Sequence, residues 1–315
     1  MIKYEKYKHK WREHGFCVIK DLIDNKILNK VVNYMKSKYT YENCYDDFGS
    51  KNMELEFPTF TILDEITMNE KLIDIVKYFL NCNNIILTQS DAWGKTGKKN
   101  KNPQSNKDQR MHMDYGNHMF LHPLSWDKID NVAVIIYLSD TKKTSGATRF
   151  VSKKINPDLY KEPYIHMPGL RNYTFINNKT EAEKYMTSVD KGVGEFREKL
   201  YKNEIKMDFE IGDILFYRLD LWHRGTPVKE GEIRYVMNMA WKKRDSYWIN
   251  SWNRSWIKHH AYYGRLEKMF VNLTPNQRGI LGIPNIGDKY WNRERLKKWK
   301  DRFPDIDIKP YLSKL

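Results

Sequence analysis

Four polar side chains, His112, Asp114, His223 and Arg234, have the types and the chain order that iron-dependent redox chemistry uses. His112 and Asp114 lie two positions apart in a strand-like stretch, so they point to the same side and can bind one metal ion. His223, 111 residues after His112, would supply a third ligand from a distant strand. Two histidines and one carboxylate fill one face of an octahedron, and the open face suits a chelating co-substrate and dioxygen, as in non-haem Fe(II) oxygenases.

The surroundings of His223 and Arg234 favour this interpretation. Residues 210–223 contain a turn signal and then an aromatic and apolar strand that we expect to end at His223. Residues 229–232 predict a hairpin turn, and residues 233–241 predict the next strand, with Arg234 beside the histidine. There its planar guanidinium could pair with one carboxylate of a dicarboxylate co-substrate while the other end chelates iron.

Each of these residues also has an ordinary explanation. His112 could be a hydrogen-bonded histidine in a sheet, Asp114 a turn residue and Arg234 a surface cation. The order and spacing of all four residues, each near a predicted strand end, favour the metal site.

Longer stretches of the chain resemble the phytanoyl-CoA dioxygenase family of Fe(II)/2-oxoglutarate oxygenases. Residues 11–24 resemble the family's opening helix, Gly-Phe and strand, and Ser145-Gly-Ala-Thr-Arg-Phe-Val151 resembles a central strand of the family. The family usually continues into a Pro-Gly-Ser-His turn, whereas this chain reads Ser-Lys-Lys-Ile. Residues 273–284 and 290–311 resemble the C-terminal extension of an uncharacterised branch.

The resemblance implies a double-stranded β-helix (jelly roll, cupin-like), mainly β with flanking helices. It implies that His112, Asp114 and His223 hold Fe(II), that Arg234 holds 2-oxoglutarate, and that O2 is consumed with release of succinate and CO2. Because Asp114 is present, the site resembles that of a hydroxylase. In the halogenase variant of the family, a small residue at this position makes room for chloride. A small-molecule substrate is implied, and the resemblance does not identify it.

Weaker contacts to the co-substrate or substrate are expected from other residues. Residues 85–93 predict a strand on which Gln89 shares a face with Asp91 and Trp93, so Gln89 would contact the ligand if that face lines the barrel. A solvent-facing strand would show the same alternation. Tyr137, Thr148 and Asn117 are further candidates for contacts to the ligand, and packing or an ordinary loop position would account for them equally well.

Periodicity predicts the remaining organisation. Helices are expected over residues 3–14, 25–38, 70–80, 179–186 and 194–200, and a buried strand over residues 132–138. The polar and basic residues 94–110 predict a loop at the mouth of the site, either a lid or a solvated insertion. We expect one catalytic domain over residues 1–315, with a helical part over about 1–80, a jelly-roll core over about 81–241 and an extension over about 242–315.

Composition sets limits on location. The sequence has no uninterrupted apolar run long enough to cross a membrane, and its charged, aromatic start is unlike a secretory signal. The three cysteines, Cys17, Cys44 and Cys82, lack metal-ligand or disulfide spacing. A reducing cytosol is therefore the expected compartment. The oligomeric state is not indicated by the sequence.

The net charge of +15 leaves other functions open. Residues 241–315 carry 17 basic and 7 acidic side chains together with nine tryptophans and tyrosines, counting from Trp241 to Trp291, that could stack on bases. A jelly roll that binds or modifies nucleic acid is the main alternative, although no nucleic-acid-binding motif accompanies this charge. An anionic substrate would also account for it, and a cupin-like metalloenzyme that works without 2-oxoglutarate is a third possibility.

Overall fold

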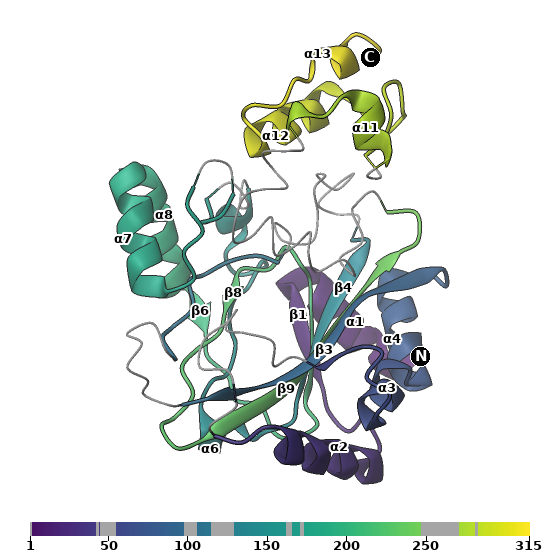
Figure 1. The fold of residues 1–315 in the computed structure, drawn as a ribbon, viewed down its shortest axis with the longest axis vertical. Helices are drawn as coiled ribbons and strands as arrows, with labels where there is room; N and C mark the ends of the chain where they lie inside the picture. The colour runs from purple at the N-terminus through teal and green to yellow at the C-terminus, as the bar shows by residue number, and fades with distance from the viewer. Residues whose placement is uncertain are drawn as a thin grey trace.

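The computed structural model describes residues 2–41, 44, 55–97, 106–114, 129–161, 166–170, 173–246, 271–280 and 283–315. Helices dominate the first 80 residues and pack on one face of a large sheet (Figure 1). The elements of this part are η1 (Ile2–Tyr4), α1 (Glu5–His14), β1 (Phe16–Ile19), α2 (Asn25–Lys38), β2 (Leu55–Glu56), α3 (Ile62–Thr67) and α4 (Glu70–Leu80).

Helices α2, α3 and α4 begin at polar capping residues, and each buries one apolar stripe. Asp24 caps α2 by accepting from the backbone N–H groups of Lys26 and Ile27, and Asn69 caps α4 in the same way. The buried residues of α2 recur at helical spacing and pack against the sheet. They are Leu28, Val31, Val32 and Met35.

The large sheet has the strand order β1-β7-β4-β9-β3-β2, and its strand pairs are antiparallel. Its longer strands are β3 (Ile85–Thr96), β4 (Asn131–Tyr137), β7 (Ile214–Tyr217) and β9 (Ile233–Lys243). Side chains alternate across it, so Tyr235 and Met237 of β9 pack toward the helices while Val236 and Ala240 pack into a second core. That second core is the interior of the jelly roll.

The small sheet has the order β6-β5-β8, from β5 (Arg149–Val151), β6 (Glu204–Ile205) and β8 (His223–Arg224). Residues 106–114 run beside β8 and are joined to it by a single bridge between His112 and His223. The interior core lies between the two sheets and includes Phe150 and Trp222 from the small-sheet side. This arrangement confirms the predicted mainly β fold with flanking helices.

Further helices surround the small sheet. The hairpin of α7 (Lys179–Val189) and α8 (Lys191–Lys202) lies beyond β6 and β8, at the edge of the molecule (Figure 1). The short helix α6 (Thr141–Thr144) connects β4 to β5, and η2 (Pro157–Tyr160) lies between β5 and α7.

The C-terminal residues form a small helical unit with its own core, at the opposite end of the molecule from α2 (Figure 1). It contains α11 (Pro275–Ile280), α12 (Arg293–Arg302) and α13 (Lys309–Leu312). Its buried centre is rich in aromatic rings, among them Tyr290, Trp291 and Trp299.

Two strand boundaries differ from the sequence prediction. The strand expected to reach His223 ends at Tyr217, a turn follows, and His223 begins the separate strand β8, so the prediction of one continuous strand is wrong. The predicted loop 94–110 is wrong at its start, because residues 94–96 continue β3 against β9. Residues 98–105 of that loop lie outside the described residues.

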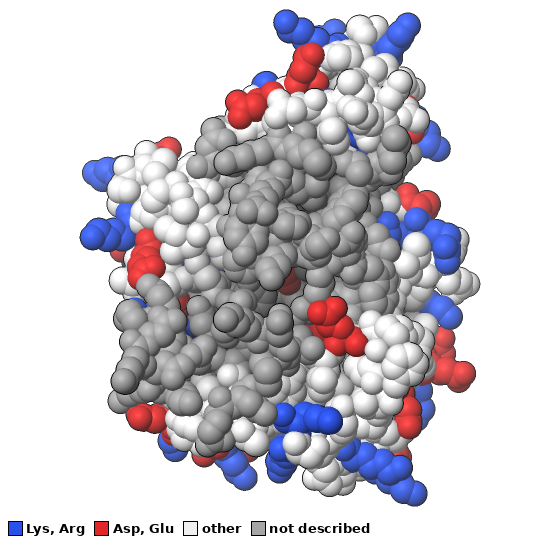
Figure 2. Space-filling view, in the orientation of Figure 1, with Lys and Arg blue, Asp and Glu red and all other residues white. Residues whose placement is uncertain are grey.

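Three of the nine aromatic residues that were expected to stack on bases are buried. Trp241, Tyr290 and Trp291 are buried in the cores and cannot stack on bases. The other six aromatic residues of that expectation lie between 247 and 263, outside the described residues. On the face shown in Figure 2, basic and acidic side chains of the described residues are interspersed around the periphery. No described helix has the length and apolar character needed to span a membrane.

Candidate metal centre

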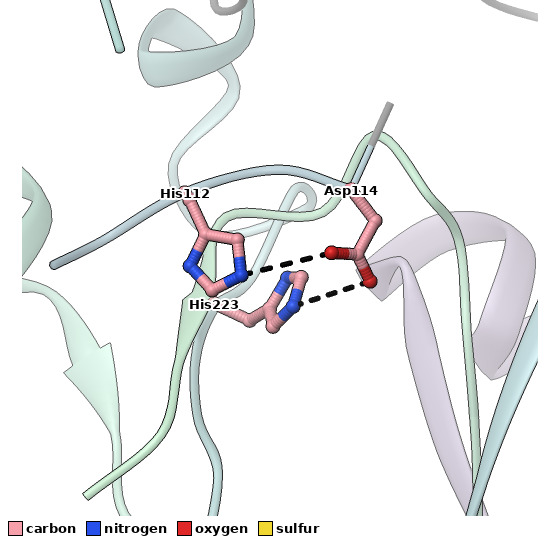
Figure 3. A group of neighbouring side chains, drawn as sticks. All are labelled: His112, Asp114 and His223. Carbon is pink, nitrogen blue, oxygen red and sulfur yellow. Dashed lines mark ion pairs between the residues drawn. The ribbon is translucent and has the colours of Figure 1, made fainter. Parts of the chain in front are cut away.

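The two histidines and the aspartate come together inside the small-sheet end of the jelly roll (Figure 3). Nε2 of His112 lies 3.6 Å from Oδ1 of Asp114, and Nε2 of His223 lies 3.4 Å from Oδ2 of the same carboxylate. One potential ligand atom from each residue falls within 4.8 Å of the others. Both histidines are 6% exposed, so the three groups face a protected space.

The backbone fixes the orientation of both imidazoles. Nδ1 of His112 lies 3.1 Å from the carbonyl of Arg110, and Nδ1 of His223 lies 2.9 Å from the carbonyl of Leu221. A carbonyl oxygen can only accept, so each Nδ1 carries a hydrogen, and in a neutral ring Nε2 then keeps its lone pair. Burial lowers the pKa of His112 well below its usual value, and the neighbouring His223 and Arg110 act in the same direction. Neutral imidazoles with free Nε2 atoms are the form that binds a metal ion.

Tyr217 was not found by the sequence reasoning and holds the carboxylate in place. Its hydroxyl donates to Oδ2 of Asp114 at 2.7 Å. Burial raises the pKa of Tyr217 well above its usual value, and the charge of Asp114 adds to that effect, so the phenol remains a donor. The aromatic strand before His223 was visible in the sequence, but nothing in the sequence indicated which of its residues would face Asp114.

Arg234 lies on the interior face of β9 with its guanidinium fully enclosed. Nη1 donates to the carbonyl of Gly146 at 2.7 Å, and the guanidinium carbon stands 4.7 Å from the ring centre of Trp93. Nε is buried without a hydrogen-bond partner, and no carboxylate of the described residues forms an ion pair with this side chain. Burial lowers the pKa of Arg234, as expected of a desolvated cation that lacks an anion.

Tyr137 and Thr148 stand next to Arg234. The Tyr137 hydroxyl accepts from the backbone N–H of Thr148 and donates to its Oγ1 at 2.8 Å, so the hydroxyl hydrogen of Thr148 is left for another acceptor. Burial raises the pKa of Tyr137, and the charge of Arg234 opposes that rise. Tyr137 in turn adds to the raised pKa of Tyr217, the residue whose hydroxyl donates to Asp114.

The predicted face of β3 does line the interior. Asp91 lies opposite Asn238 of β9, and Gln89 lies opposite Ala240. Gln89 donates to Oδ2 of Asp91 at 2.7 Å. Burial raises the pKa of Asp91 to about 7, and the charges of Glu56 and Asp114 add to the increase while the Gln89 hydrogen bond opposes it. Asn117 lies outside the described residues.

The turn that departs from the family pattern has a structural role. Ser152 Oγ lies 2.9 Å from Nδ1 of His14, and Lys153 forms an ion pair with Asp220 at 2.9 Å. Arg218 also binds Asp220, through two hydrogen bonds of 2.8 and 2.7 Å. This buried group therefore joins the turn to the segment that leads into His223.

Comparisons with known proteins agree with this geometry. A family model described as phytanoyl-CoA dioxygenase (PhyH) matches residues 11–236. No curated protein matches the chain.

Several solved structures share the fold. The non-heme alpha ketoglutarate dependent epimerase SnoN from nogalamycin biosynthesis is 10% identical with a TM-score of 0.53, covering 82% of this chain and 89% of its own. A second SnoN structure contains Fe3+, alpha ketoglutarate and nogalamycin RO. The carbocyclase SnoK, from the same biosynthesis, is 12% identical with a TM-score of 0.53 over 78% of this chain and 85% of its own. EvdO2 from Micromonospora carbonacea var. aurantiaca is 10% identical with a TM-score of 0.52, over 76% and 90%.

Proposed function

The chain belongs to the phytanoyl-CoA dioxygenase family of Fe(II)/2-oxoglutarate-dependent oxygenases, and on that premise we propose that it hydroxylates a small organic molecule. In this proposal His112, Asp114 and His223 hold Fe(II), and Arg234 holds the far carboxylate of 2-oxoglutarate. The observation that carries it is the convergence of two Nε2 lone pairs and one carboxylate in a buried space. We further propose that the helical part, the jelly roll and the C-terminal unit act as one catalytic domain.

The donor set fits a ferrous ion. Two neutral imidazoles and one carboxylate supply three ligands from one side, which suits iron that must keep open positions for other ligands. The carbonyls of Arg110 and Leu221 orient the two rings, and Tyr217 orients the carboxylate. Each proposed ligand therefore has a second contact that limits its rotation.

The surroundings of Arg234 fit a carboxylate of 2-oxoglutarate. A buried guanidinium that forms no ion pair with the described residues is costly, and a bound carboxylate would supply a counter-charge and an acceptor for Nε. The free hydroxyl hydrogen of Thr148 could donate to the same group. Tyr137 would then orient Thr148 rather than contact the co-substrate with its own hydrogen.

Bound Fe(II) would let dioxygen act as the oxidant, with one oxygen atom used to convert 2-oxoglutarate to succinate and CO2 and the other used to hydroxylate the substrate. The contribution of the protein is to position these groups and to exclude water. The site lies beside the apolar interior core, and the ring centre of Tyr217 from that core is 5.2 Å from the ring centre of His223. The apolar side chains of this core limit the access of water to the reacting atoms.

The wall formed by Asp91, Gln89 and Asn238 indicates which kind of substrate group the site would accept. Asp91 lies close enough to Asp114 for the two charges to interact, and Asp91 is 3% exposed. An acidic and amide-lined wall accepts hydrogen bonds from hydroxyl or amine groups and repels anions. We therefore propose that the reacting end of the substrate is a neutral or cationic polar group, and that any anionic part of the substrate binds elsewhere.

An anaerobic titration tests the proposed function. Addition of Fe(II) and then 2-oxoglutarate to the protein is expected to produce the weak visible charge-transfer band of the iron chelate. His112→Ala should lose the band while remaining folded by circular dichroism. A folded wild-type protein that gives no band would refute the proposal, and so would succinate formation that persists in His112→Ala.

The alternative of nucleic-acid binding makes a different prediction. It requires tight, salt-sensitive binding to DNA or RNA without oxygen consumption. The described aromatic residues of the C-terminal region do not favour it, because they are buried in cores.

A further inference from the structure

The helical hairpin α7–α8 holds the backbone immediately before His112. The backbone N–H of Met111 donates to the hydroxyl of Tyr201 at 2.8 Å, and the carbonyl of Met111 accepts from Nη2 of Arg197 at 2.9 Å. Both peptide groups that flank this residue are therefore bound by side chains of α8. We refer to Arg197, Glu183 and Tyr201 as the Met111 clamp.

The clamp lies along the edge of the segment that carries His112, at the place where a neighbouring strand would pair with Met111 in a regular sheet. On one side, His112 exchanges both of its backbone hydrogen bonds with His223. On the other side, the N–H and carbonyl of Met111 point to α8, where side chains replace the backbone groups of a strand. A buried backbone group needs a partner, so these side-chain contacts satisfy the exposed edge of the ligand-bearing segment.

The clamp is itself held rigidly. Nε and Nη2 of Arg197 each donate to Glu183 at 2.7 Å, and Tyr201 donates to Oε1 of Glu183 at 2.5 Å. Nη1 of Arg197 reaches the carbonyl of His166 at 2.7 Å. Arg197 is fully buried, and such a two-pronged ion pair has one favoured geometry. Displacement of either helix would therefore move Met111 or break this pair.

We propose that the Met111 clamp is a positioning device for the metal ligand His112, which binds metal through Nε2 only if the backbone of Met111 stays in its present place. This inference rests on the proposed function. The mechanism is indirect, because no clamp side chain contacts the imidazole. Arg197, Glu183 and Tyr201 set the path of the chain from Arg110 to His112, and that path keeps Nδ1 of His112 against the carbonyl of Arg110.

Metal affinity tests the clamp without requiring turnover. Ni²⁺ is a suitable probe because imidazole sites bind it more tightly than Fe(II). Calorimetric titration of Tyr201→Phe, which keeps the ring and loses the hydroxyl, is expected to show Ni²⁺ affinity reduced by about tenfold, the lower end of the effect of outer-shell partners. The matched control is Tyr185→Phe. Tyr185 lies in the same helical hairpin, and its hydroxyl accepts from the backbone N–H of Thr174, away from His112. The control should bind Ni²⁺ as the wild type does.

The double variant shows whether the effect passes through His112. If it does, Tyr201→Phe should not weaken Ni²⁺ binding further in a His112→Ala background. Arg197→Lys keeps the charge and loses the fork that reaches Met111, and it should weaken binding in the same way. If Arg197→Lys fails to fold, Tyr201→Phe still decides the matter.

The outcomes separate the two proposals. A wild-type protein that binds no Ni²⁺ would overturn the proposed metal site and the clamp with it. Wild-type binding with equal affinities for Tyr201→Phe and Tyr185→Phe would overturn the clamp alone. An effect of Tyr201→Phe that persists unchanged in His112→Ala would also overturn it, since the loss would then not involve that ligand.

Discussion

His112 and His223 exchange both of their backbone hydrogen bonds, each N–H donating to the carbonyl of the other at 2.9 Å. This single bridge joins two segments that are 111 residues apart and holds their ring centres 4.4 Å apart. The separation of the imidazoles is therefore set by the backbone before any metal binds. Such preorganisation lowers the entropy cost of metal binding, because the two rings need not be ordered when the metal binds.

Metal binding should stabilise the folded protein. The site forms only in the native chain, so a ligand at about 100 times its dissociation constant adds about 2.7 kcal/mol to the free energy of unfolding. We expect Ni²⁺ to raise the melting temperature by several degrees and a chelator to reverse the rise. Scanning calorimetry of wild type and His112→Ala measures this. An equal rise in both proteins would place the bound Ni²⁺ elsewhere.

Tyr217→Phe should weaken metal binding while leaving the fold intact. The change removes the hydroxyl that donates to Oδ2 of Asp114 and leaves the carboxylate free to rotate. The loss of affinity should be about 10- to 100-fold, measured by Ni²⁺ titration. Tyr235→Phe is the control, because its hydroxyl contacts the carbonyl of Tyr39 on the helix side of the sheet. Similar affinities for these two variants would contradict the proposed role of Tyr217.

Arg234→Lys should raise the 2-oxoglutarate concentration needed for turnover without changing Ni²⁺ affinity. A charged hydrogen bond contributes about 1.5–3 kcal/mol, so the KM for 2-oxoglutarate should rise by roughly 10- to 100-fold. Succinate formation at varied 2-oxoglutarate measures the change. Arg149→Lys serves as the control, because Arg149 lines a groove with Lys206 and Asp208 that Arg234 does not line. An unchanged KM in Arg234→Lys would show that the co-substrate binds elsewhere.

Acid should destabilise the segment that leads to His223. Burial alone would raise the pKa of Asp220, but Arg218 and Lys153 outweigh it and hold the pKa below its usual value. A depressed carboxyl pKa gives stability that is fully present above the unfolded value near 4 and is lost as the pH falls toward the folded value. Asp220→Asn should lose about 3–5 kcal/mol at pH 7 because the buried Arg218 and the partly buried Lys153 lose their partner.

Denaturant unfolding between pH 3 and pH 7 checks this prediction. The difference in unfolding free energy between wild type and Asp220→Asn should be largest near neutral pH and should shrink below pH 4. Glu13→Gln is a suitable control, because the Glu13 ion pair with Lys154 is exposed. A difference for Asp220→Asn that does not change with pH would indicate lost packing rather than lost charge.

Local patterns in the sequence were sufficient for much of the fold. The apolar spacing predicted α2 at its observed bounds, and α4 was predicted equally well. The family resemblance indicated the jelly roll and pointed to His112, Asp114, His223 and Arg234 as the residues to examine. These features depend on residues near one another in the chain, or on motifs that a family shares, and both can be recognised without coordinates.

Other features were decided by tertiary contacts alone. The strand expected to run to His223 stops at Tyr217, and only the paired segments show that the same Tyr217 faces Asp114. Asp114 raises the pKa of Asp91, Arg234 donates to the carbonyl of Gly146, and Tyr201 accepts from the backbone N–H of Met111. The two residues of each of these pairs lie more than twenty positions apart in the sequence. A single sequence carries the type of each side chain, whereas the distance between two side chains, and the burial that sets their charge, arise only when the separate segments pack together.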